Sequence, residues 1–102
     1  MPLKAAFIFL AQGADAQRHR VTVTTPQVDL TTVGVADYAA AERAAQALVA
    51  EGVGAIELCG GFGIGGAARI AHAVAGKAVV GVVRFDAHPG LHGKSGDDIF
   101  GD

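Results

Sequence analysis

Hydrophobic and polar residues follow two different periods along the chain, and these periods divide it into strands and helices. Apart from Lys4, residues 3–11 form a continuous apolar run rich in Phe and Ile, the pattern of a central strand covered on both faces. Residues 21–25 alternate Val and Thr, and because Pro26 cannot donate to a neighbouring strand, this segment is predicted to be an edge strand or a strand end. Residues 28–35 alternate and then become apolar, which predicts a further strand.

The second half of the chain predicts helices that alternate with strands. Asp37 has the side chain of an N-cap for a helix over residues 38–50, in which Ala, Leu and Val recur at helical spacing, and Gly52 ends that helix. The remaining predicted elements are a strand over residues 55–59, a glycine loop over 60–66, a helix ending near Gly76 and a β-branched strand over 78–85. This order is typical of right-handed parallel crossovers.

We therefore predict a single α/β domain over residues 1–102, since a chain of 102 residues builds one modest core. Its fold class is a small three-layer sandwich with a mostly parallel sheet of four or five strands, of flavodoxin-like or half-Rossmann-like topology. Residues 86–102 are rich in Gly, Asp and Lys with few apolar side chains. They are predicted to form a C-terminal tail or flap.

The composition of the chain limits which classes of partner and which cellular compartment are expected. Hydrophobic residues make up 51% and charged residues 18%, so part of the apolar surface is expected to meet another subunit in a homodimer or higher homo-oligomer. The net charge of −2 and the scattered basic residues argue against nucleic acid and an anionic membrane surface. No apolar run approaches the ~20 residues that span a bilayer. The single cysteine, Cys59, has no internal disulfide partner, which fits a reducing compartment and a cytoplasmic location.

The glycine loop is the main candidate for a binding site. Without Cβ atoms, its glycines take positive φ, admit a close neighbour and leave free amides at a helix start, which attract anions. Loops that follow parallel strands meet at one edge of the sheet, where ligands bind, so residues after the last strand are expected beside this loop. The candidate ligand-binding residues are Gly60, Gly61, Phe62, Gly63, Gly65, Gly66, Asp86 and His88.

Three interpretations of this loop stay open. Its glycines allow tight packing of helix on sheet, or its amides bind a phosphate or carboxylate. In the third, Gly61, Gly63 and Gly66 satisfy the G-x-G-x-x-G pattern of an NAD-type site, with Asp86 twenty residues beyond the last of them. A complete dinucleotide fold needs two halves, and one is missing here.

Cys59 and Glu57 are the candidate catalytic residues. Cys59 ends a strand where a helix begins, a setting that favours the thiolate when the sulfur reaches solvent; the alternative is a small buried filler. Glu57 is a proton-transfer candidate when both faces of the sheet are covered, and a solvated strand residue when its face is open. His88 and His92 lie near Asp86 but lack the defined spacing of a metal site, so neither a metal nor another cofactor is predicted.

Two resemblances add to these inferences. The run E-L-C-G-G-F-G from Glu57 to Gly63, together with Thr25-Pro26, L-T-T-V-G-V over 30–35 and the tail from Asp86 to Phe100, resembles a family of small prokaryotic α/β proteins of unknown function. That resemblance implies one compact α/β domain. Strand-Cys-Gly at Cys59 also resembles one half of the aspartate, glutamate and hydantoin racemases, in which a cysteine moves the proton on the carbon next to a carbonyl. Those enzymes use two opposed cysteines, whereas this chain has one.

Three functional hypotheses follow. The first is a site for a small anionic metabolite at the carboxyl edge of the strands, with proton transfer of the isomerase or lyase type. The second is a noncatalytic oligomeric binding or interaction module, in which the glycine loop only packs. The third is an NAD-type nucleotide binder.

Overall fold

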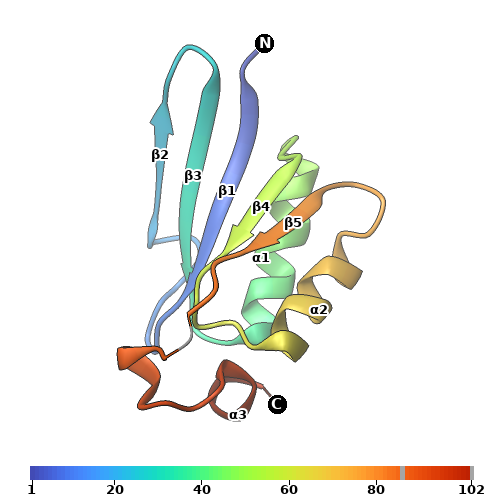
Figure 1. The fold of residues 1–102 in the computed structure, drawn as a ribbon. Coiled ribbons are helices and arrows are strands. Elements are labelled where there is room, and N and C mark those ends of the chain that lie inside the picture. The colour runs from blue at the N-terminus through green and yellow to red at the C-terminus, as the bar shows by residue number, and fades with distance from the viewer. Residues whose placement is uncertain (86, 102) are drawn as a thin grey trace.

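Strands and helices follow one another in the order that the hydrophobic pattern predicts. The computed structural model describes residues 1–85 and 87–101. Its elements are β1 (Leu3–Leu10), β2 (Arg20–Thr24), β3 (Val28–Val35), α1 (Tyr38–Ala50), β4 (Ala55–Leu58), α2 (Ile64–Ala73), β5 (Val79–Val82), the 3-10 helix η1 (Pro89–Leu91) and α3 (Gly96–Phe100) (Figure 1). All five predicted strands and both predicted helices are present, and β5 ends three residues before Phe85, where the prediction placed its end.

The strands form one five-stranded sheet in the order β2-β3-β1-β4-β5. The pairs β3-β1, β1-β4 and β4-β5 are parallel, and β2 pairs antiparallel with β3 at the edge. The edge position of β2 agrees with the prediction from Pro26, which has no N–H to offer a further strand. The predicted α/β class with a mostly parallel sheet is therefore confirmed, with one antiparallel pair added.

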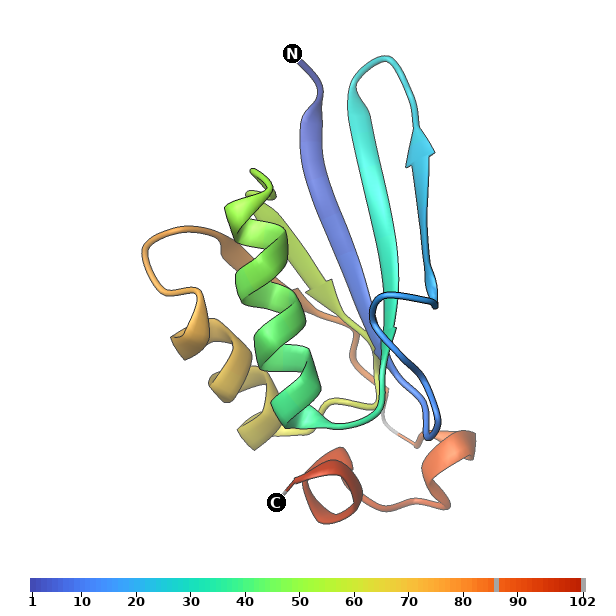
Figure 2. The ribbon, with the colours of Figure 1, turned by 180° about the vertical axis from the view of Figure 1, so that it is seen from behind.

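Both long helices cover the same face of the sheet (Figures 1 and 2). The chain crosses from β3 over β1 to β4 and then moves in the same direction to β5, so two right-handed crossovers place α1 and α2 side by side. The prediction of three layers is wrong, because the sheet and these helices form two layers. A flavodoxin-like topology, which needs helices on both faces, is not confirmed.

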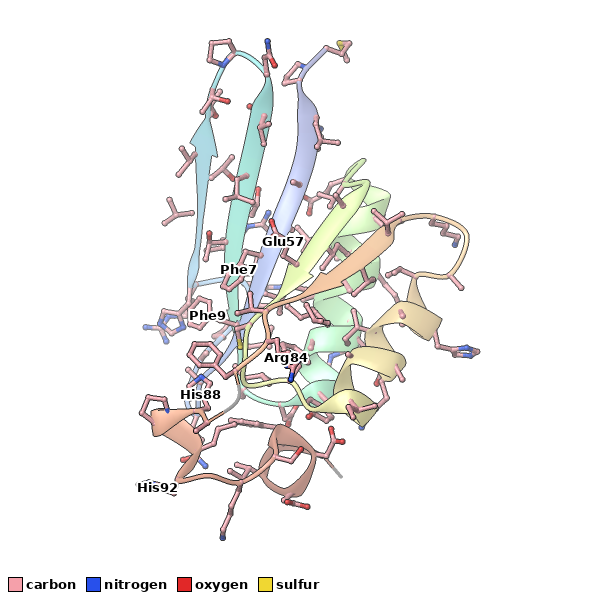
Figure 3. The ribbon with its side chains drawn as sticks, viewed as in Figure 1. Phe7, Phe9, Glu57, Arg84, His88 and His92 are labelled. Carbon is pink, nitrogen blue, oxygen red and sulfur yellow. The ribbon has the colours of Figure 1, made fainter. Side chains whose placement is uncertain are left out.

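The opposite side of the sheet, which we call the open face, carries Phe7 and Phe9 of β1 and Glu57 of β4 (Figure 3). The core lies on the helix side, where Ile8, Val35 and Leu58 are fully buried. Alanine positions of α1 pack against them, as expected of a helix whose thin side-chain layer lets it lie close to a sheet. Among the described residues, no helix has the length and apolar content needed to cross a membrane.

The two ends of α1 are set by local chemistry that the sequence predicts. Asp37 is the N-cap, and its Oδ1 accepts the N–H of Ala40 at 2.8 Å. After the helix, Gly52 takes φ +101°, a conformation that a side chain would strain. The N-cap of α2 is Gly63, which has no side chain to offer its first turn. The amides of that turn must find another acceptor.

Gly66 in α2 provides a test of how closely the helices approach each other. A Cβ at this position would overlap the ring of Tyr38, which is only 2% exposed and cannot move into solvent. We expect Gly66→Ala to lower the free energy of unfolding by about 1–3 kcal/mol in urea denaturation, although Ala is the better helix former. Gly54→Ala, whose Cβ would meet no heavy atom within 4 Å, should change it by less than about 0.5 kcal/mol. Equal stability of the two variants would contradict this packing.

Candidate functional site

Two amides of the glycine loop donate to the C-terminal tail of the same chain. Asp97 in α3 accepts the N–H of Gly65 through Oδ2 at 2.8 Å and the N–H of Gly66 through Oδ1 at 2.9 Å. The Tyr38 hydroxyl accepts the N–H of Gly63 at 3.0 Å and donates to Asp97 Oδ1 at 2.7 Å. A carboxylate thus lies at the helix N-terminus, where the glycines predict an anion, and the chain itself supplies it. We call this arrangement of Tyr38, Asp97 and the glycine loop the tail latch.

The glycines of the loop give the tail room to approach. A Cβ at Gly65 would lie 2.9 Å from Asp97 Oδ2, and a Cβ at Gly63 would overlap the side chains of Ser95 and Asp97. On the tail side, a Cβ at Gly96 would overlap the carbonyl oxygen of Gly61. The close packing of the loop is therefore packing against the tail as well as against the sheet.

The latch perturbs the acidity of both its side chains. The hydrogen bond from Tyr38 holds the pKa of Asp97 below its usual range, and the N–H groups of Gly65 and Gly66 lower that pKa further. Burial raises the pKa of Tyr38 to about 12, and the Asp97 carboxylate also raises it. The Tyr38 ring stacks on Phe62 with ring centroids 5.5 Å apart. The lowered pKa of Asp97 and the raised pKa of Tyr38 both favour a neutral phenol that donates to a charged carboxylate.

A pocket of about 490 Å³ lies beside the latch, at the carboxyl ends of β1 and β4. We call it the Cys59 pocket. It is lined by Leu10, Ala11, Gln12, Cys59, Gly61, His88, Gly90, Leu91, His92, Ile99 and Phe100. The pocket therefore combines two strand ends, the glycine loop and the tail.

Cys59 is half-buried at the wall of this pocket. Its Sγ accepts the N–H of Leu10 at 3.4 Å and the N–H of Gly61 at 3.3 Å. Leu10 is the last residue of β1 and Gly61 lies in the glycine loop after β4, so the sulfur is held between a strand end and the loop.

His88 reaches the same pocket from the tail (Figure 3). Its ring packs against Phe85, with centroids 4.4 Å apart, and its Nδ1 accepts the N–H of Gly90 at 3.0 Å. In the neutral ring the proton is then on Nε2, which is left to interact with a ligand. His92 also lines the pocket and stands at φ +52°, a left-handed conformation that turns the chain after η1.

The structure separates the predicted site residues into three groups. Cys59, Gly61 and His88 line the pocket, and Gly60 lies next to the His88 ring. Gly63, Gly65 and Gly66 take part in the latch, while Phe62 is buried against Tyr38. Glu57 is exposed on the open face, outside the lining of the pocket (Figure 3). Asp86 lies outside the described residues.

Sequence reasoning missed Tyr38, Asp97 and Gln12 as parts of this site. The sequence pattern predicts Tyr38 only as the first residue of a helix, and Asp97 only as a polar residue of the tail. The signals that point to them are modest: Tyr38 is the sole tyrosine, and Ser95 accepts the N–H of Asp97 as the N-cap of a short helix. Gln12 lies in a loop without hydrophobic periodicity.

A larger hollow of about 730 Å³ lies on the outer side of α1. Most of its charged groups already bond within the chain, since Arg20 pairs with Glu51 at 3.3 Å, Asp37 caps α1 and Asp15 caps its own turn, while Arg43 also lines it. The Cys59 pocket differs in having a cysteine and two histidines in its lining. Nowhere in residues 1–85 and 87–101 do three or more His, Cys, Asp or Glu side chains gather closely enough to hold a metal ion.

A family model described as a family of unknown function (DUF6506) matches residues 3–98. The chain belongs to this family. The DUF6506 match begins at the first residue of β1 and extends into α3, so it includes Cys59 and Asp97. The predicted membership of a family of unknown function is confirmed, whereas the match gives no support to the racemase resemblance. No curated protein and no solved structure matches the chain.

The latch can be followed through Tyr38, because the chain has one tyrosine and no tryptophan. In Asp97→Asn, we expect the ionisation of Tyr38, measured by ultraviolet absorbance, to move from about 12 toward the ordinary 10.0, because the neighbouring negative charge is gone. Asp98→Asn, which removes the same charge one residue away, should leave it unchanged. An unchanged Tyr38 titration in Asp97→Asn would contradict the latch.

The lowered pKa of Asp97 also predicts a pH dependence of stability. A carboxyl with a lowered pKa in the folded state stabilises the fold above its unfolded value of 3.8, and this contribution is lost as the pH falls through the folded value. At pH 7 we expect the native protein to exceed Asp97→Asn by about 1 kcal/mol in free energy of unfolding. In urea denaturation this difference should shrink only below a pH of about 4. A difference that grows toward acid pH would show that the charged carboxylate does not stabilise the fold.

Proposed function

We propose that the Cys59 pocket binds a small anionic metabolite and that Cys59 and His88 transfer protons on it, as in an isomerase or a lyase. The observation that carries this proposal is the position of the Cys59 sulfur. It is held by two backbone N–H groups at the wall of a pocket that two histidines also line.

The lining of the pocket fits a small acid. Gln12, His88 and His92 provide polar groups, while Leu91 and Phe100 provide apolar contact area. Among the described residues, the lining contains no Asp or Glu side chain that would repel an anion. A volume of about 490 Å³ lies within the range of small-molecule sites.

The place of the pocket in the sheet supports the same proposal. After β1 the chain turns toward β2 at one edge of the sheet, whereas after β4 it turns into α2, which packs near β5 at the other edge. The two loops therefore diverge between adjacent parallel strands. A crevice at the carboxyl ends of strands whose connections diverge is the usual ligand site of open α/β sheets.

The chemistry divides between two groups. Cys59 would remove a proton from a carbon next to the ligand carboxylate or carbonyl, and the negative charge on the carbon would pass to the adjacent oxygen. His88, through Nε2, would supply a proton to that oxygen or return one to the carbon. Glu57, which faces away on the open face, has no role in this proposal.

The occupied glycine loop favours one alternative and weakens another. If the loop only seats the tail, the protein is a noncatalytic binding or interaction module, and the latch is the observation in favour. An NAD-type site would need its pyrophosphate at the amides that Asp97 and Tyr38 occupy, beside a negative carboxylate. These occupied amides argue against the third hypothesis.

Thermal shift with a panel of small carboxylic acids and sugar phosphates tests the binding step, because a ligand that binds only the folded state raises its melting temperature. We expect a stabilising acid, and in His88→Gln an increase in its dissociation constant of roughly tenfold. His72→Gln, which changes an exposed histidine outside the pocket, is the matched control and should bind as the native protein does. No response to any acid, or equal weakening in both variants, would contradict the pocket.

Deuterium exchange tests the chemical step on the acid that this panel identifies. In D2O we expect the native protein to exchange the hydrogen on the carbon next to the carboxylate, as followed by proton NMR. Cys59→Ala should retain binding and lose the exchange, because the base is missing. Binding without exchange in the native protein would favour the noncatalytic module.

A further inference from the structure

The apolar side chains of the edge strand β2 lie on the open face of the sheet. All five of its residues are exposed, and it lies beyond the helices at the edge of the sheet (Figure 2). Its pairing with β3 places Val21 and Val23 on the open face, opposite Thr32 and Leu30. Thr22 and its polar neighbours point to the helix side. Since alternation puts apolar residues on the side to be buried, this strand is built for cover on the face that has no helix.

The rest of the open face continues the same pattern. Leu3 on β1 is 52% exposed and Val79 on β5 is 70% exposed, while Phe7 and Phe9 are half-buried between them. By the register of the strands, Glu57 is the single charged side chain on this face. A contiguous, nearly uncharged surface across five strands is typical of an interface and rare on an isolated monomer.

We propose that the open face is the interface of a homodimer, in which two copies of this chain pack sheet against sheet. A two-fold axis requires a surface that is complementary to itself, and a nearly uncharged apolar sheet meets that requirement without pairing of charges. Two such sheets pack about 10 Å apart with their strands within about 30° of each other. A highly charged partner would find no complementary charges here.

The size of the face agrees with a dimer. Strand residues occupy about 3.3 Å along the chain and strands lie about 4.8 Å apart, which gives this sheet a projected area of roughly 450 Å². This projected area is of the same order as the roughly 600–800 Å² of accessible surface that each partner contributes to the smaller stable interfaces, since side chains add relief to the plane. Glu57 lies on β4, two strands from β3, whereas β2 is adjacent to β3, so an axis near β3 would place Glu57 farther from the centre of the contact than Val21.

Two substitutions on adjacent residues of β2 test this interface. Val21→Glu adds a charge to the open face, and Thr22→Glu adds the same charge to the opposite side of the same exposed strand. Each is measured by light scattering coupled to size-exclusion chromatography and by sedimentation over a concentration series. We expect the native protein and Thr22→Glu at twice the chain mass of 10.2 kDa. In Val21→Glu the dimer dissociation constant should rise at least about 100-fold, because a buried charge would lack a partner.

Other results would overturn the interface. A native protein that stays monomeric at high micromolar concentration would contradict the dimer. A mass above that of a dimer would contradict a closed two-fold contact. If the dimer dissociates in both variants, or in neither, the contact does not lie on the open face. Circular dichroism confirms that each variant is folded, and Val23→Glu replaces Val21→Glu if the latter unfolds. Neither substitution touches the Cys59 pocket, so the dimer can fail while the proposed function stands.

Discussion

The arrangement of this protein depends on the hydrogen bonds between the Asp97 carboxylate and the first amides of α2. A helix leaves its first amides without partners, and α1 satisfies one of them with the adjacent Asp37. In α2 the N-cap is Gly63, so the acceptor comes from the far end of the chain. Because Tyr38 donates to the same carboxylate, one contact joins the start of α1, the start of α2 and the tail.

This contact also determines the shape of the Cys59 pocket. The end of β1 and the glycine loop contribute the two N–H donors to the Cys59 sulfur, but His88, Leu91 and Phe100 belong to the tail. Without the latch, the tail would lose its polar anchor and the pocket would lose one wall. If the pocket binds a ligand as proposed, its affinity and the stability of the latch are coupled, since a ligand that contacts both walls binds only the docked tail.

The success of sequence reasoning here followed the range of the interactions. Asp37 and Gly52 act on their own helix, and Pro26 acts on its own strand, so local chemistry predicted each of them. The glycine loop predicted an anion at α2, but no local pattern shows that residue 97 supplies it, 31 positions beyond Gly66. Composition likewise cannot place Gln12 in the pocket, because its loop has no periodicity.

The prediction of a third layer was wrong for a physical reason that lies in β1. The run through Phe7, Ile8 and Phe9 predicts burial on both faces, and Ile8 meets that prediction under the helices. On the other face a third layer was expected, and the chain provides none. If a second copy covers Phe7 and Phe9, the partner's sheet takes the place of that layer and the apolar pattern is satisfied on both sides. The interpretation of β1 then holds for the dimer, and the mistake lies in assigning the cover to the same chain.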